Sequence, residues 1–77
     1  MKIGDKAIWI PVNFALRMVE KEHPHYGKVV TIIEGIDRFG RYRISVDDFP
    51  NCNSRDKVNR FMADEVELLE IKNVAKN

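Results

Sequence analysis

The two histidines of the chain, His23 and His25, lie in the stretch HPHYGKVVTI, directly before a run of β-branched residues. A His-x-His pair can hold a transition metal when two further ligands join it. The residues that could supply them are Asp47, Asp48 and Cys52. Zinc sites usually show paired ligand spacings, which this sequence lacks. Because Pro24 fixes the backbone and Gly27 permits a bend, we predict a polar turn that leads into a strand, and no metal site.

No residue pattern indicates catalysis. Cys52, in PNCNS, has no basic residue nearer than Arg55 to activate its thiol. Ser45 and Ser54 lack the glycines of a nucleophile elbow, and no glycine-rich loop could hold a phosphate. The interior of so small a domain is filled by its own side chains. We therefore expect a protein that is not an enzyme, with no catalytic residue, no cofactor and no small-molecule substrate.

Arginines alternate with an aromatic residue in the segment of residues 38–43. Arg38, Phe39, Arg41 and Arg43 are of the types that stack on bases and contact phosphates of single-stranded nucleic acid. The full set predicted for such binding is Lys28, Arg38, Phe39, Arg41, Arg43 and Arg60. The alternative is a solvated outer face of a strand, which is the usual fate of charged runs. Binding of RNA or single-stranded DNA is therefore the second hypothesis.

Aromatic residues are concentrated in the segments that should connect the strands, where polar residues are the rule. These aromatics, together with arginines that could rim them, are the residue types that contribute most to interface energy. The predicted partner-binding residues are Phe14, His25, Tyr26, Arg38, Phe39, Arg41, Phe49 and Arg55. Phe14 and Phe49 could instead close the ends of a barrel. Trp9 could pack under a short helix formed by residues 13–22 or be presented to a partner. The first hypothesis is a protein-binding adaptor or inhibitor that occupies a partner's surface.

Composition is compatible with one small globular domain in a reducing, cytoplasmic setting. The 77 residues are 44% hydrophobic and 32% charged, and the single cysteine cannot form an internal disulfide. No apolar stretch is long enough to span a membrane. The net charge is +1, but basic residues are in excess over residues 38–60 and acidic ones over residues 64–70. This separation of basic and acidic residues favours binding to a partner surface of complementary charge over unspecific binding to a polyanion such as nucleic acid.

Hydrophobic patterning predicts five strands, over residues 6–12, 27–34, 41–46, 57–62 and 66–71. Spacings of four from Phe14 to Met18 and from Ala15 to Val19 predict a short helix over residues 13–22. Residues 63–65 should form a single helical turn, and residues 72–77 a frayed tail. A helix over residues 64–75 is the competing prediction for the C-terminal part. The expected core is Ile8, Ile10, Val29 or Val30, Ile32, Tyr42, Ile44, Val46, Val66, and Leu68 or Leu69.

The order of these elements resembles the SH3-like barrel. IGDKAIWI followed by YGKVVTIIEGI is similar to the first two strands of KOW-type barrels, and FMADEVELLE to the aromatic residue, turn and acidic last strand that close them. A small reaction-centre protein of photosystem I and short bacteriophage or prophage proteins share this outline. The chain departs from KOW modules in its long first connection, residues 13–26, and in lacking a basic balance.

The resemblance implies a mainly β protein with one SH3-like, five-stranded small barrel over residues 1–71 and a short helix in its first loop. A KOW-like barrel would bind nucleic acid. A small phage or mobile-element protein would block a host or defence protein. The identity of that protein partner does not follow from the resemblance.

Overall fold

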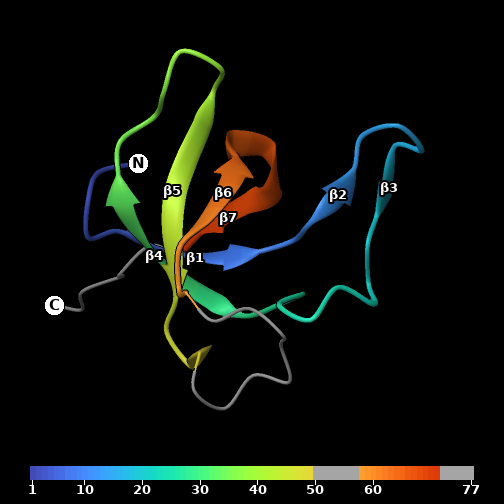
Figure 1. Cartoon of the computed structure of the whole chain (residues 1–77), viewed down its shortest axis with the longest axis horizontal. Coiled ribbons are helices and arrows are strands. Elements are labelled where there is room, and N and C mark those ends of the chain that lie inside the picture. Colours follow the sequence, from blue (N-terminus) through green and yellow to red (C-terminus); the bar gives the residue numbers. More distant parts are fainter. Residues whose placement is uncertain (50–57, 72–77) are drawn as a thin grey trace, which may run out of the picture.

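The protein is mainly β. A computed structural model describes residues 1–49 and 58–71. Five strands form one antiparallel sheet in the order β6-β5-β4-β1-β7, and the sheet curls into a half-barrel (Figure 1). These strands are β1 (Lys6–Trp9), β4 (Val29–Glu34), β5 (Arg41–Val46), β6 (Phe61–Asp64) and β7 (Leu68–Glu70). A 3-10 helix (Glu65–Glu67) joins β6 to β7. None of the helices in these ranges has the length and apolar composition needed to cross a membrane.

The core on the inner side of the sheet confirms most of the predicted residues. Those confirmed as buried are Val30, Ile32, Tyr42, Ile44, Val46 and Leu68. The prediction was wrong for β1, where Ala7 and Trp9 are buried while Ile8 and Ile10 are only half-buried. The register explains this, because Trp9 pairs with Leu68 and Ala7 with Val30, so both share the inner face.

Four of the five strands differ in their bounds from those predicted: β1 ends at Trp9, β4 begins at Val29 and β7 begins at Leu68. β6 begins later than predicted, and the helical turn lies at Glu65–Glu67 rather than at residues 63–65. In consequence Val66, predicted for the core, lies on the helix and is 72% exposed. The competing helix over residues 64–75 is wrong for Leu68–Glu70, which pairs with β1. The predicted tail, residues 72–77, lies outside the described residues.

The helix predicted over residues 13–22 is not present. The segment is instead a hairpin of β2 (Val12–Asn13) and β3 (Met18–Val19), which projects from the sheet (Figure 1). The Asn13 side chain accepts a hydrogen bond from the backbone N–H of Leu16, 3.1 Å away, which closes a tight turn. Arg17 then adopts a left-handed backbone with φ 54°, which no helix continues through.

Candidate partner-binding surface

The histidine stretch forms a turn, as predicted. The expectation of a polar turn was wrong for His25, which is fully buried against the core. The backbone N–H of Tyr26 donates to the carbonyl of His23, and that of Lys28 to the carbonyl of His25. Gly27, at φ 74°, donates its N–H to the carbonyl of Trp9, 2.8 Å away. A positive φ of this kind favours glycine. The turn therefore carries the chain from the hairpin back into β4.

Both histidine rings belong to an aromatic cluster, defined as Trp9, His23, His25, Phe49 and Phe61. His25 is fully buried, and its ring stacks on Trp9 with centroids 5.8 Å apart and planes 10° apart. Its centroid is also 4.7 Å from that of Phe61. The Nδ1 atom of His23 accepts the backbone N–H of His25. In residues 1–49 and 58–71, no three His, Cys, Asp or Glu side chains gather into a group that could hold a metal ion.

The aromatic cluster changes the set of residues that a partner could reach. His25, predicted as a contact, is buried. Phe49 is half-buried, packs against the core and has its ring centroid 6.0 Å from that of Phe61. Trp9 is only 5% exposed and faces inward. Two further predicted residues, Arg55 and the candidate ligand Cys52, lie outside the described residues.

The turn between β4 and β5 presents the predicted arginines around a phenyl ring. Phe39 is 63% exposed, and the guanidinium carbons of Arg38 and Arg41 lie 5.0 and 5.3 Å from its ring centroid. We call these three residues the Arg/Phe turn. Asp37 organises it, because its Oδ1 accepts the backbone N–H groups of Phe39, at 2.8 Å, and Arg41, at 3.0 Å.

The same contacts set the charge of the Asp37 carboxyl. The hydrogen bond from the Arg41 backbone is the largest influence, and it lowers the pKa of Asp37 below its ordinary value against a smaller opposing effect of desolvation. Gly40, at φ 79°, donates its N–H to the Asp37 carbonyl and completes the turn. The Arg/Phe turn is therefore fixed by backbone hydrogen bonds rather than by its own long side chains.

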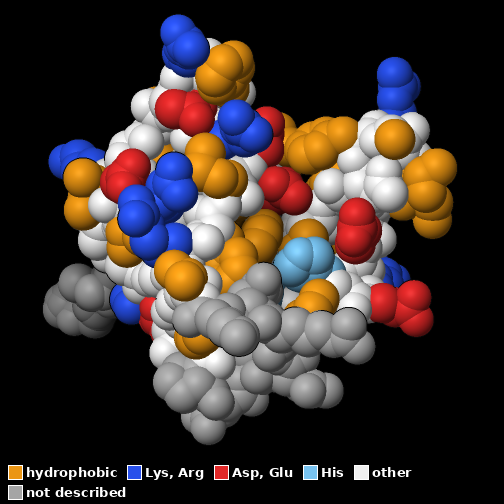
Figure 2. Space-filling view, viewed as in Figure 1, with side chains coloured by type: hydrophobic (Ala, Val, Ile, Leu, Met, Phe, Trp, Pro, Cys, Tyr) orange, Lys and Arg blue, Asp and Glu red, His pale blue; other side chains and the backbone are white. Residues whose placement is uncertain are grey.

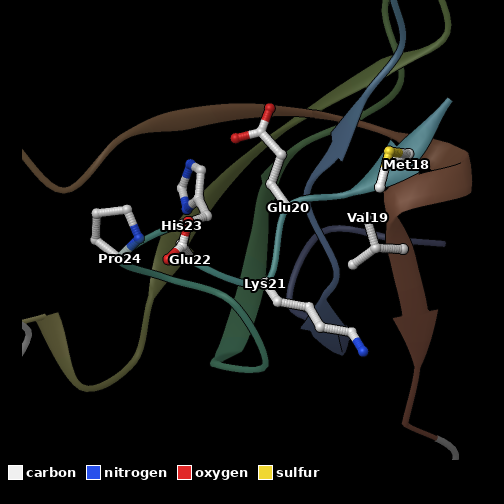
Figure 3. Close-up of a pocket in the computed structure, with 7 residues that line it drawn as sticks. All are labelled: Met18, Val19, Glu20, Lys21, Glu22, His23 and Pro24. Carbon is white, nitrogen blue, oxygen red and sulfur yellow. The ribbon is translucent and has the colours of Figure 1, made fainter. Parts of the chain in front are cut away.

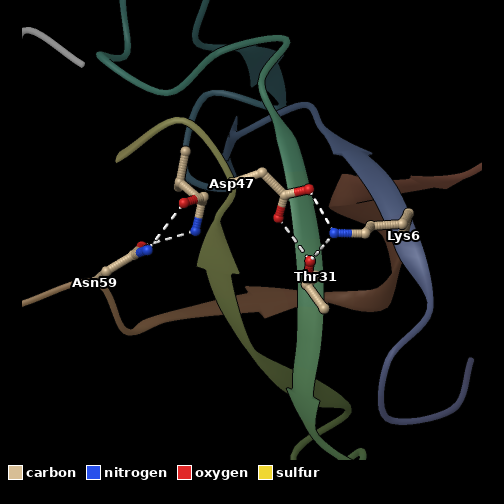
Figure 4. A network of polar contacts seen from close by, with 5 residues as sticks. Lys6, Thr31, Asp47 and Asn59 are labelled. Atoms are coloured by element: carbon tan, nitrogen blue, oxygen red, sulfur yellow. Dashed lines mark hydrogen bonds and ion pairs between the residues drawn. The ribbon is translucent and has the colours of Figure 1, made fainter. Parts of the chain in front are cut away.

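Basic residues on the outer face of the sheet are paired with acids. Glu34 contacts Arg60 at 2.8 Å and Arg43 at 3.6 Å. The Lys6 ammonium lies 2.6 Å from an Asp47 carboxylate oxygen (Figure 4). The charge of two arginines of the predicted nucleic-acid set, Arg43 and Arg60, is thus partly neutralised by Glu34.

A polar network on this face links β1 and β4 to Asp47, the residue that follows β5. Thr31 Oγ1 donates to Asp47 Oδ1 and accepts from Lys6 Nζ, each at 2.6 Å (Figure 4). Partial burial raises the pKa of Asp47, but the hydrogen bonds from Lys6 and Thr31 outweigh it and hold the pKa below its ordinary value. The network ties β1, β4 and the end of β5 together.

Large apolar side chains project from the β2–β3 hairpin. The exposed fractions are 55% for Phe14, 66% for Leu16, 63% for Met18 and 41% for Val19. We call these four residues the apolar hairpin, and Figure 2 shows hydrophobic side chains on this projecting arm. Sequence reasoning singled out only Phe14. The signal for the others was the alternation of Phe14, Leu16 and Met18, which fits a strand as well as the spacings of four fit a helix.

An open groove runs along the second half of the hairpin (Figure 3). It is lined by Met18, Val19, Glu20, Lys21, Glu22, His23 and Pro24. The sequence led us to expect no substrate cavity inside the barrel, and this groove lies on the surface. Its walls are apolar at Met18 and Val19 and charged at the next three positions. It extends the apolar hairpin toward the aromatic cluster.

The 3-10 helix forms hydrogen bonds both to the base of the hairpin and to the Arg/Phe turn. The Glu67 carboxylate accepts the backbone N–H of Val12 through Oε2, and that of Asp64 through Oε1. At the start of the helix, the Glu65 N–H donates to the carbonyl of Gly40, 3.2 Å away. Both projecting segments are therefore hydrogen-bonded at their bases to the same short helix. Figure 2 shows a hollow between them.

Comparison of the chain with protein-family models, with curated proteins and with solved structures found no match.

Proposed function

We propose that this protein is a non-enzymatic binding module, an adaptor or inhibitor that acts by occupying the surface of a partner protein. The observation that carries the proposal is the apolar hairpin. Four large apolar side chains stand exposed on an arm that projects from the sheet. Apolar side chains exposed together, rather than scattered singly, mark interaction sites on soluble domains.

The energetics favour a partner that covers the hairpin. Removing apolar area from water contributes about 25 cal/mol per Å², or about 1.5–3 kcal/mol for one large side chain that becomes fully buried. The four side chains of the hairpin are already partly buried, so each can supply about half of this amount when a partner covers it. Association costs translational and rotational freedom, so contacts from the Arg/Phe turn and from the exposed Val66 would add to those of the hairpin.

We also propose that the half-barrel is an SH3-like barrel. Three features support this finer description: five short antiparallel strands, a long first connection, and a single helical turn directly before the last strand. In place of the expected helix, the first connection contains the β2–β3 hairpin. Short phage and prophage proteins share this outline, and an inhibitor of a host or defence protein would be consistent with a module of this size.

Nucleic-acid binding remains the alternative, favoured by the two guanidinium groups over Phe39. It is weakened because Arg43 and Arg60 pair with Glu34. Contact with about four phosphates would give a log-log salt slope of about −3 to −4. Binding of an oligo-dT or oligo-U strand with that slope, at micromolar concentrations, would support the alternative; no binding at tens of micromolar in low salt would dispose of it.

The test of the proposed function is affinity capture from a lysate of the cells in which the chain is naturally made, with nuclease present. The variant Leu16→Ser/Met18→Ser removes apolar area from the hairpin. The matched control is Ile3→Ser, because Ile3 is 69% exposed but lies outside the hairpin. The proposal expects one protein that is retained with nuclease, kept by the control and lost by the hairpin variant. Capture that is identical in all three chains, or that depends on nucleic acid, would contradict it.

A further inference from the structure

We propose that the Arg/Phe turn selects the partner by binding carboxylate side chains, so that the partner presents an acidic protein segment with an apolar residue beside the acid. This inference rests on the proposed protein-binding function and names the chemistry of the partner. It starts from the geometry of the turn, where two guanidinium groups lie within 5.3 Å of the centroid of one phenyl ring. Contacts of this kind hold the cations in place, because the face of the ring attracts positive charge.

The hydrogen-bond donors of these two arginines are largely unused. Arg41 Nε lies 4.0 Å from Asp37 Oδ2, which is too far for a hydrogen bond, and the other oxygen of Asp37 is occupied by backbone N–H groups. Among the described residues Arg38 makes no close ion pair with a carboxylate, although its charge helps to lower the pKa of Asp37. Each guanidinium carries five N–H donors in a planar fork that matches a carboxylate.

The remaining basic residues of the sheet provide the contrast. Arg43 and Arg60 share Glu34, and Lys6 pairs with Asp47. On the open sheet face, then, the basic groups lie 2.6–3.6 Å from carboxylate oxygens. On the projecting turn, Asp37 acts on the two arginines at longer range, with its Oδ2 4.0 Å from Arg41 Nε. The turn is also prepared in advance, since Asp37 fixes its backbone before any ligand arrives. A fixed pair of guanidinium groups loses less freedom on binding than two mobile side chains would.

The surroundings favour a protein carboxylate over the phosphates of a nucleic acid. Asp64 lies directly opposite Arg41 in the strand register, and Glu65 is exposed and bonded through its N–H to Gly40. A polyanion that ran from the turn across the 3-10 helix would meet these acids. A single acidic side chain needs only the two arginines. The exposed ring of Phe39 and the exposed methyl groups of Val66 would then contact an apolar neighbour of that acid.

The experiment is a selection of short random peptides displayed on phage against the immobilised full chain, followed by binding measurements on the enriched peptides. The inference expects Asp or Glu next to a large apolar residue in those peptides. It expects Arg38→Gln/Arg41→Gln to reduce the affinity for these peptides by about tenfold or more, as loss of a charge-assisted hydrogen bond does. The matched control, Arg43→Gln/Arg60→Gln, removes the same charge from the Glu34 pairs and should change affinity by less than about threefold.

The outcomes separate this inference from the proposed function. The enriched peptides could lack acids, bind Arg38→Gln/Arg41→Gln as tightly as the unaltered chain, and fail to bind Leu16→Ser/Met18→Ser. That result would support the proposed function and overturn the inference. No enrichment of acidic peptides overturns it as well. Binding of oligo-dT that depends on the two arginines, in place of peptide binding, assigns the turn to nucleic acid and overturns both proposals. Because both arginines are exposed, unchanged thermal unfolding of each variant will show that the fold is intact.

Discussion

The carboxylate of Glu67 accepts the backbone N–H of Val12 at 2.8 Å, across 55 positions of the sequence. Glu67 is only 9% exposed, and its other oxygen accepts the N–H of Asp64. One side chain therefore caps the 3-10 helix and holds the first residue of the hairpin. This contact joins the base of the apolar hairpin to the helix.

We expect Glu67→Ala to lower the free energy of unfolding by about 2–4 kcal/mol, because it leaves two backbone N–H groups in a partly buried place without an acceptor. Urea denaturation at neutral pH measures the change. Glu65→Ala, on the exposed side of the same helix, should cost less than about 1 kcal/mol. Equal losses in the two variants would show that Glu67 has no special structural role.

The Asn59 side chain lies just before the start of β6 and is hydrogen-bonded to the last residue of β5. Its amide accepts the N–H of Val46 at 2.7 Å and donates to the carbonyl of Val46 at 2.8 Å (Figure 4). Asn59→Ala should cost about 1–3 kcal/mol, as loss of buried hydrogen-bond partners does. Asn59→Asp should cost more, because a carboxylate would face the carbonyl oxygen. Thermal unfolding of the two variants tests this order, and an aspartate that is tolerated better than alanine would contradict it.

Acid should weaken the network around Asp47. The folded-state pKa of this carboxyl is lowered, so the stabilisation is present above the unfolded-state pKa and is lost as the pH falls through the folded one. The wild type should therefore lose stability relative to Asp47→Asn as the pH falls below the ordinary pKa of an aspartate, about 4. Lys6→Met removes the ammonium that helps to lower the pKa, and it should reduce the pH dependence as well. Denaturant titrations at several pH values give the comparison; parallel profiles for wild type and Asp47→Asn would refute the assignment.

His25 should act as a core residue. Truncation by His25→Ala leaves a cavity between the rings of Trp9 and Phe61, and a cost of about 2–4 kcal/mol is expected, as for other large-to-small core changes. Lys21→Ala, at an exposed position nearby, should change stability by less than about 0.5 kcal/mol. Urea unfolding followed by Trp9 fluorescence reports both the stability and the packing of the cluster. A negligible effect of His25→Ala would mean that the aromatic cluster is not a packed unit.

Strands were predictable from the sequence where apolar residues occupy every second position, so that only one face of the strand is apolar. β5 matches its predicted bounds because Tyr42, Ile44 and Val46 alternate with polar residues. In β1 both alternations are apolar, and only the pairing of Trp9 with Leu68, which is a long-range contact, decides which faces inward. Short-range pattern carries no information about such a contact.

The candidate surface was predictable only in part for the same reason. Phe39 and its arginines stand out by residue type, and the structure brings them together. The hairpin was mistaken for a helix because its apolar residues fit both the helical and the strand period. Nothing in the sequence indicates that Arg17 adopts a left-handed backbone conformation. Glu67 could not be distinguished from the neighbouring acids, since its role depends on Val12.

The apolar hairpin also has a colloidal consequence. A protein with a net charge of +1 has little long-range repulsion between its copies, and charge near zero favours association and precipitation. Exposed Leu16 and Met18 would supply the attraction. The second virial coefficient of the isolated chain should therefore be negative near neutral pH, and should rise when Leu16→Ser/Met18→Ser is introduced or a ligand covers the arm. The rate at which the protein aggregates in solution should thus report whether the hairpin is covered, even before a ligand is identified.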